Sequence, residues 1–420
     1  MRLRVTRFGS DARAEEVRAI APPARAVEDD VRAIVQEVRR DGDAAVRRFT
    51  ERFDHAEVAP DELRVPVRDV DEAVALLEPD VLRGLRKAIA NVRAAAEAQL
   101  REPARIELED GQSVEIAEVP VRRAAAYVPG GRAPYPSTVV MCAVTARAAG
   151  VEEFAVCAPP GPEGRAHPVV LAACALCGVN EVYRMGGAQA IAALAYGTDT
   201  VPSVDLIVGP GNAYVTEAKR QVAGVAGIDG LAGPSELVVV ATEGADPELV
   251  ALDLLAQSEH GEDSPLVLVS PDAGLLDRVE ETIAALSTEL PTVTAAPLAI
   301  VLAADAAAAV RLADEIAPEH LELVGGEAEA LAGRIRRAGC LFVGRGAGAA
   351  FGDYVAGSNH VLPTGGAARF QSGLSVATFR RRMARVSLSE QAARALAPYG
   401  AALARAEGFP IHGESMERRA

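Results

Sequence analysis

From residue 153 to residue 343 the chain alternates short apolar runs with helical stretches, and this alternation constrains the fold more than any other feature. The predicted strands of a first set are 153–158, 181–185 and 204–208, and the helices that follow them are 166–177, 188–196 and 213–225. A second set has strands at 236–241, 265–269, 299–303, 321–324 and 340–343, with helices predicted over 247–259, 273–286, 306–316 and 328–337. Such β-α repetition is typical of parallel sheets with helices on both faces.

Two successive sets predict an α/β fold made of two Rossmann-like parallel-sheet lobes with a cleft between them. We place the first lobe at 126–234 and the second at 235–380. The region before them, 1–125, shows the apolar spacing of amphipathic helices, as at 31–48, and part of it is expected to pack on the second lobe. A helical tail is expected over 381–420. Because ligands of such sheets bind beyond the carboxyl ends of the strands, we expect the functional residues there.

An excess of acidic residues argues against a nucleic-acid binder. The chain has 43 Lys and Arg against 59 Asp and Glu, a formal charge of −16, whereas neutralising phosphates needs a basic face. No apolar run approaches the roughly 18 to 20 residues that span a bilayer, and residues 1–7 lack the apolar core of a signal peptide. We therefore expect a cytoplasmic protein that binds neither nucleic acid nor membranes. Only two basic residues are lysines, Lys87 and Lys219, which is typical of codon bias, and we infer no function from it.

Five cysteines, an odd number, do not predict a disulfide framework. Cys174 and Cys177 form a single C-x-x-C near the C-terminal end of a predicted helix, whereas a redox motif favours a helix N-terminus, where the thiolate is stabilised. The sequence offers no second pair for a four-cysteine zinc site. We interpret both as core cysteines.

Four of the six histidines lie beside carboxylates, amides or glycines at the ends of predicted elements. These are His260, His320, His360 and His412. The other two, His55 and His167, stand in polar contexts and are predicted at the surface. The placement of the first four indicates a site.

Two of these histidines have a neighbour of matching chemistry. Gln257 and His260 are three positions apart at a predicted helix end, so their side chains face the same way and are able to bind a metal. A helix end that uses a histidine to satisfy its last carbonyls explains them equally well. Glu319 and His320 are adjacent between a helix and a strand. They offer two bases of different strength, which suits a reaction with more than one proton abstraction, although a helix cap followed by a polar strand start is the alternative.

The stretch 351–366 interleaves Asp353, Asn359 and His360 with glycines, and we expect it to be irregular rather than helix or strand. Loops of this kind carry ligands, because glycine lets the backbone approach closely. The preceding stretch 344–349 fits the G-x-G-x-x-A dinucleotide pattern, but no helix is predicted after it, so we treat the match as a false positive. Gly-Pro-Gly-Asn-Ala at 209–213 lies between a predicted strand and a predicted helix and is a better place for a phosphate or ribose.

Six stretches recur with the order and spacing of one known family. They are Tyr-Val-Pro-Gly-Gly at 127–131, Val-Gly-Pro-Gly-Asn at 208–212, Gly-Pro-Ser-Glu at 233–236, Ser-Glu-His-Gly at 258–261, Ala-Pro-Glu-His-Leu-Glu at 317–322 and Gly-Asp-Tyr-x-x-Gly-x-Asn-His-x-Leu-Pro-Thr at 352–364. On these motifs the chain closely resembles the histidinol dehydrogenases over nearly its whole length. The resemblance implies a homodimeric enzyme of histidine biosynthesis that oxidises L-histidinol to L-histidine in two NAD-dependent steps, through an enzyme-held aldehyde, with one zinc ion per subunit.

The resemblance also implies roles for individual residues. His320 would take the proton of the alcohol, and Glu319 would activate the water that attacks the aldehyde. The implied zinc ligands are Gln257, His260, Asp353 and His412. The implied NAD contacts, on the side of the first lobe, are Tyr127, Gln189 and Asn212. The implied substrate contacts are Ser235, Gln257, His260, His320, Asp353, Glu407 and His412, with His360 as a further neighbour of the substrate.

Glu407 and His412 stand in the C-terminal tail, which in this family completes the site of the partner subunit. The tail keeps the spacing of these two residues but differs from the family between them.

Three other functions remain open at this point. One is a relative that oxidises another small alcohol, such as a sulfonated diol, against which Ser235 and Glu407 speak. Another is a non-catalytic zinc-binding relative, which would need neither Glu319 nor His320. A zinc hydrolase is the third, but the sequence contains no H-E-x-x-H motif.

Overall fold

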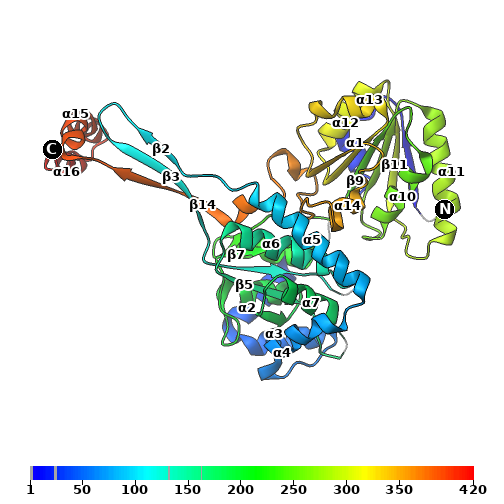
Figure 1. The fold of residues 1–420 in the computed structure, drawn as a ribbon, viewed down its shortest axis with the longest axis horizontal. Helices are drawn as coiled ribbons and strands as arrows, with labels where there is room; N and C mark the ends of the chain where they lie inside the picture. Colours follow the sequence, from blue (N-terminus) through cyan, green and yellow to red (C-terminus); the bar gives the residue numbers. More distant parts are fainter. Residues whose placement is uncertain (1–2, 23–25, 131–132, 162) are drawn as a thin grey trace.

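The computed structural model describes residues 3–22, 26–130, 133–161 and 163–420, and it confirms the predicted α/β fold class. In this part of the chain two parallel sheets form two lobes, and a three-stranded antiparallel ribbon leads away from them to the C-terminal helices (Figure 1). None of the described helices is long and apolar enough to cross a membrane.

The first lobe is built on a five-stranded parallel sheet with the order β6-β5-β4-β7-β8. Its strands are β4 (Arg123–Tyr127), β5 (Glu153–Ala158), β6 (Val182–Arg184), β7 (Leu206–Val208) and β8 (Gly227–Ile228). Its helices are α2 (Glu28–Asp41), α3 (Asp43–Asp54), α4 (Val67–Ala73), α5 (Pro79–Glu97), α6 (Pro136–Ala149), α7 (Pro168–Leu176), α8 (Gly187–Tyr196) and α9 (Ala213–Val222). Alternate residues of β4 point to opposite faces: Ala124 and Ala126 pack with α5, α6 and α7, whereas Ala125 and Tyr127 pack with α2, α3, α8 and α9.

The second lobe is built on a six-stranded parallel sheet with the order β1-β11-β10-β9-β12-β13. Its strands are β1 (Arg4–Phe8), β9 (Leu237–Ala241), β10 (Leu266–Ser270), β11 (Pro297–Leu302), β12 (His320–Val324) and β13 (Cys340–Val343). Its helices are α1 (Ala14–Arg18), α10 (Pro247–Ser258), α11 (Ala273–Glu289), α12 (Ala306–Ile316), α13 (Gly326–Ala330) and α14 (Ala349–Tyr354). The N-terminal strand β1 pairs with β11, so the first residues of the chain belong to this sheet while α2 to α5 surround the other.

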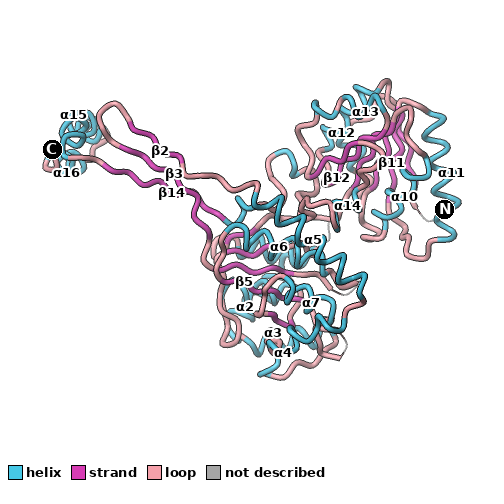
Figure 2. Tube along the Cα trace, in the orientation of Figure 1, coloured by secondary structure: helices cyan, strands magenta, loops and turns pink. Residues whose placement is uncertain are grey.

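The ribbon consists of β2 (Ala104–Glu107), β3 (Ser113–Pro120) and β14 (Arg380–Ser387), with β3 in the middle. It carries α15 (Glu390–Ala406) and α16 (Pro410–Glu417) at its far end, away from both lobes (Figure 2). We call the ribbon and these two helices the arm. Short 3-10 helices complete the structure at Pro60–Glu62, Val74–Leu76, Ala332–Arg334, Ala367–Arg369 and Val376–Phe379.

Several local predictions are wrong, each for a physical reason. The helix expected over 31–48 breaks at Gly42, which has a positive φ of 57°. The helix expected over 328–337 is a short α13 followed by a 3-10 turn. The tail expected to be helical from 381 begins as β14, because Arg380–Ser387 pairs with the distant β3. Such a nonlocal partner is not visible in a local pattern.

Two helices near His320, α6 and α14, were not predicted. The helix α6 is buried on all sides, with 11 of its 14 residues buried, so it lacks the apolar periodicity of a surface helix. The helix α14 occupies the start of the stretch expected to be irregular, so the statement that no helix follows 344–349 is wrong. At the start of α14 the Glu322 carboxylate accepts the N–H of Ala349 at 2.6 Å, so this N–H is not available to a phosphate.

The predictions for the cysteines and for two histidines are confirmed. All five cysteines are free thiols; Cys174 is buried and Cys177 partly buried in α7 and the turn after it. Burial raises the pKa of both thiols, that of Cys177 to about 12. His55 and His167 are exposed.

Candidate active site

Glu319 and His320 lie side by side at the start of β12. We call the line of side chains that they form with Ser235 and Asp353 the row. The helix α12 ends at Ala317 in the left-handed region (φ 52°), and the chain then turns directly into the strand. Glu319 Oε2 accepts hydrogen bonds from Ser235 Oγ at 2.6 Å and from the N–H of Glu236 at 2.9 Å. Both side chains are nine-tenths buried or more, so neighbouring groups rather than water set their charge and orientation.

His320 lies between two carboxylates. Its Nδ1 is 3.4 Å from Glu319 Oε2, and its Nε2 is 3.4 Å from Asp353 Oδ1. Burial lowers the pKa of the imidazole, but the two carboxylates outweigh burial, so that the pKa is raised overall. Burial likewise opposes ionisation of Asp353, but contact with His320 and weaker attraction from His360 and His260 lower its pKa.

The remaining predicted residues of the second lobe surround this row. Gln257, at the end of α10, donates through Nε2 to Ser235 Oγ at 2.7 Å. His260 lies in the turn after α10, exposed but within electrostatic reach of Asp353. His360 Nδ1 is 2.9 Å from the carbonyl oxygen of Asp353, and its Nε2 is 3.1 Å from Thr138 Oγ1 on α6 of the first lobe. The structure thus brings together every predicted site residue of the second lobe.

The short helix α14 places Asp353, and one buried acid, Glu322, and one partly buried acid, Asp253, lie against its start. Glu322 of β12 accepts the N–H of Ala349, and a Cβ on Gly348 would lie 2.8 Å from Asp253 Oδ1, so the chain passes tightly against both carboxyls. Burial, and then Asp253, raises the pKa of Glu322. Neither acid was singled out in the sequence, although an acid at 322 between apolar strand residues was the available signal.

Glu236 is a second buried acid that the sequence reasoning missed as a functional residue. Its Oε1 accepts the N–H of Glu319 at 3.2 Å and that of Gly365 at 3.0 Å, while Oε2 is 3.6 Å from Arg18 of α1. Its own backbone carbonyl lies 3.3 Å from His320 Nδ1. Glu236 therefore contacts both Glu319 and His320 from behind.

Protonation of Glu236 is expected to make stability pH-dependent. Burial raises its pKa to about 7, with Arg18 opposing and Glu319 reinforcing the effect. An acid whose pKa is raised by folding binds more protons when folded, so its contribution to stability is present at low pH. This contribution is lost as the pH rises toward 7, and the free energy of unfolding falls by about 3 kcal/mol.

The measurement is the melting temperature of Glu236→Gln and of the wild-type protein between pH 5 and pH 8. The variant, which mimics the neutral acid, should gain on the wild type as pH rises. Glu243→Gln, at an exposed glutamate, is the matched control. Parallel curves for Glu236→Gln and the wild type would contradict this expectation.

The predicted NAD residues lie at the carboxyl edge of the first sheet, after β4, β6 and β7. The hydroxyl of Tyr127 accepts the N–H of Gly187 at 3.3 Å. Asn212 caps α9, accepting the N–H groups of Tyr214 and Val215 at 3.0 and 3.2 Å. Gln189 is 1% exposed, and neither atom of its amide has a hydrogen-bond partner among the described residues. Gly131, the last residue of the motif at 127–131, lies outside the described residues.

Two predicted site residues lie elsewhere. Glu407 and His412 are exposed, at the junction of α15 with α16 and in α16, at the far end of the arm (Figure 1). Within one chain the structure does not bring them to the other site residues. The described residues contain no group of three or more His, Cys, Asp or Glu able to hold a metal ion.

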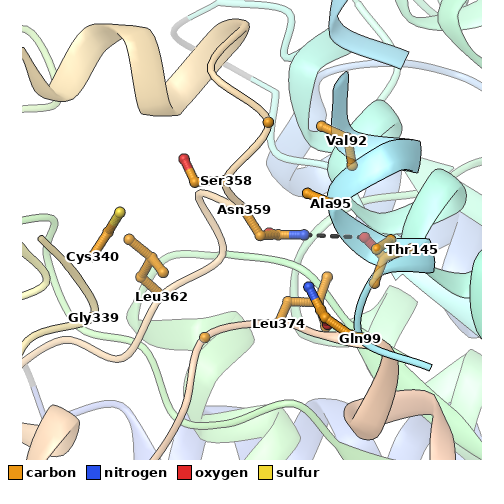
Figure 3. Close-up of a pocket in the computed structure, with 13 residues that line it drawn as sticks. Val92, Ala95, Gln99, Thr145, Gly339, Cys340, Ser358, Asn359, Leu362 and Leu374 are labelled. Atoms are coloured by element: carbon orange, nitrogen blue, oxygen red, sulfur yellow. Dashed lines mark hydrogen bonds between the residues drawn. The ribbon is translucent and has the colours of Figure 1, made fainter. Parts of the chain in front are cut away.

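The lobes are joined beside the site by the segment 357–362. Asn359 Nδ2 donates to Thr145 Oγ1 at 3.3 Å and to the carbonyl of Met141 at 3.1 Å, both on α6 (Figure 3). A cavity of about 250 Å³ lies between this segment, α5 and the start of β13. None of the predicted site residues is among those that line it, so it is separate from the row described above.

Comparisons with known proteins agree on one family. A family model described as histidinol dehydrogenase matches residues 20–420. The chain belongs to the histidinol dehydrogenase family. The histidinol dehydrogenase of Rhodospirillum rubrum is 46% identical over 408 residues, which cover 94% of this chain and 93% of that protein. That of Gluconobacter oxydans is 44% identical over 401 residues, with 94% and 93% covered.

A solved structure supports the same family. The crystal structure of histidinol dehydrogenase from Elizabethkingia anophelis matches with a TM-score of 0.91 and 31% identity, covering 99% of this chain and 98% of that one. The resemblance inferred from the motifs is confirmed. The chain is an NAD-dependent oxidoreductase of the histidinol dehydrogenase kind, a class of enzyme of histidine biosynthesis.

Proposed function

We propose that this protein oxidises L-histidinol to L-histidine through L-histidinal, reducing two NAD. The observation that carries the proposal is the adjacency of Glu319 and His320, two buried bases joined at 3.4 Å. An alcohol oxidation and an aldehyde oxidation each need a proton removed, from the hydroxyl and from the attacking water. Two neighbouring bases of different strength match these two requirements.

His320 is proposed to accept the proton of the substrate hydroxyl while hydride leaves to NAD. Glu319 is proposed to deprotonate the water that adds to the aldehyde, and Ser235 and the N–H of Glu236 orient its carboxylate through their bonds to Oε2. His320 is the first residue of β12 and Glu319 immediately precedes it, and both side chains are buried, which fixes their relative position before substrate binds.

Gln257, His260, Asp353 and His412 are proposed to hold zinc. An amide oxygen, two imidazoles and a carboxylate form a donor set that zinc accepts. Of the four residues, Gln257, His260 and Asp353 are gathered in the second lobe. Gln257 donates through its amide nitrogen to Ser235, and this leaves the amide oxygen of Gln257 to serve as the ligand. When bound, zinc would orient the substrate and draw the charge of Asp353 away from His320, favouring the neutral base.

Tyr127, Gln189 and Asn212 are proposed to contact NAD in the first lobe. The unpaired amide of Gln189 supports this, because a buried amide without partners costs free energy unless a ligand supplies them. Asn212 is exposed at the N-terminus of α9, where the helix dipole favours a phosphate.

Glu407 and His412 are proposed to act in the site of a partner subunit, so that the enzyme is a homodimer with shared sites. Their position at the tip of an arm that leaves its own lobes supports this. Together with Ser235, Gln257, His260, His320 and Asp353 of the other chain, they would surround the substrate, with His360 close by. The second lobe would then supply the bases and most of the ligands. The enzyme is proposed to act in the cytoplasm.

Substrate choice tests the proposal. The protein, supplied with zinc and NAD, should form NADH with L-histidinol and not with a sulfonated diol of similar size. NADH formed from the diol alone would assign the protein to a different small alcohol.

A further inference from the structure

One of the two lysines is buried in the first lobe and, together with an aspartate, holds both sides of a single glycine. Lys219 of α9 donates from Nζ to the carbonyl oxygen of Gly209 at 2.6 Å and to Asp229 Oδ1 at 2.5 Å. Asp229 Oδ2 accepts the N–H of Gly209 at 2.7 Å. The side chains of the pair are 4% and 8% exposed, so water does not compete for these bonds.

Gly209 begins the segment 209–212, which leads from β7 to the cap of α9. Its φ is 107°, and a Cβ there would overlap the carbonyl oxygen of Tyr127. The turn is one that other residues cannot adopt, and glycine alone does not hold it, since glycine adopts many conformations. The ion pair fixes it from both sides.

We propose that Lys219 and Asp229 are positioning residues for the cofactor: they hold Gly209 so that Asn212 and the N-terminus of α9, which Asn212 caps, face NAD. This inference rests on the proposed binding of NAD at the carboxyl edge of the first sheet. Neither residue contacts the reacting atoms, and both act through the segment 209–212.

Composition supports a specific need for lysine. In a chain with 43 basic residues, all but Lys87 and Lys219 are arginines, so arginine is the default cation. An ammonium is compact and directs its donors at a carbonyl and a carboxylate together, whereas a planar guanidinium requires more room and a fork of acceptors. Lys87 is exposed on α5, where no such geometry applies.

The same pair is linked to the catalytic lobe. Gln371 Nε2 donates to the backbone carbonyl of Asp229 at 3.0 Å. Thr364 and Gly365, earlier in the same segment of the second lobe, bond to Gly233 and to the carboxylate of Glu236. The ion pair therefore lies where the segment 209–212 of the first lobe approaches the segment 364–371, which supports Glu236.

Three variants and one control test the proposal. Lys219→Met removes both bonds of the ammonium, Lys219→Arg keeps its charge but not its shape, and Asp229→Asn keeps the shape of the acid. Lys87→Met is the matched control. Without cofactor, amides of residues 206–216 should exchange hydrogen faster in the three variants than in the wild type and the control.

Calorimetry should show NAD binding weakened on the order of tenfold to a hundredfold in the variants, with the KM for L-histidinol within about twofold of wild type. Unchanged exchange, or faster exchange with unchanged NAD affinity, overturns the proposal. If Lys219→Met fails to fold, Lys219→Arg and Asp229→Asn decide by the same criteria. A wild type that binds NAD but does not oxidise histidinol would refute the proposed function and leave this test intact.

Discussion

His320→Ala is expected to lower the rate of histidinol oxidation by about 10²- to 10⁴-fold, the usual contribution of a general base. The imidazole is 2% exposed and lies between two carboxylates, so bulk water has little access to take over its role. Glu319→Gln should leave the first oxidation within a few-fold of wild type and slow the second by a similar 10²- to 10⁴-fold. The amide introduced by this substitution would keep the shape of the side chain but accept no proton.

The two steps are separated by supplying L-histidinol and L-histidinal as independent substrates and following NADH in single turnovers. His55→Ala, which removes an exposed histidine far from the row, is the control. An equal loss with both substrates in Glu319→Gln would contradict the division of labour between the two bases.

His412→Ala is expected to be as inactive as His320→Ala when each variant is assayed alone, yet mixing the two should restore activity. His412 lies at the end of the arm and His320 in the second lobe. In a shared-site dimer, these two residues of one chain therefore belong to the two different active sites. A mixed dimer then holds one site with neither substitution. Random exchange of equal amounts should return about a quarter of wild-type activity, since half of the dimers are mixed and each has one intact site.

The mixing experiment requires proof that subunits exchange, for which two tags of different size on the variants suffice. Glu407→Gln should complement His320→Ala in the same way. Full inactivity of a verified mixed dimer would show that the arm does not complete the partner's site.

Most strands of the two parallel sheets could be predicted because buried parallel strands are nearly all apolar, as in Leu237–Ala241, and because most are followed by a helix of recognisable length. Three strands of these sheets, β1, β4 and β8, were not predicted. The ribbon could not be predicted, since paired residues of β3 and β14 are at least 260 positions apart in sequence. Both strands are half-exposed or exposed, so neither carries a core pattern. The helix α6 was missed because it is buried all round.

The site shows the same division between local and nonlocal information. Glu319 and His320 are neighbours in the sequence, and their adjacency was enough to indicate two bases. The acids behind them, Glu236 and Glu322, act through contacts that exist only after strands from different parts of the chain are paired. The excess of arginine over lysine was attributed to codon bias, and no role was inferred for Lys219 until its bonds to Gly209 and Asp229 were seen.

The number of NADH molecules formed per L-histidinol tests the central claim most directly. With limiting L-histidinol, excess NAD and added zinc, we expect two NADH per substrate, L-histidine as the product, and no NADH after chelation until zinc is restored. One NADH per substrate with the aldehyde left over, or a yield that chelation does not change, would contradict a zinc-dependent oxidation in two steps at this site.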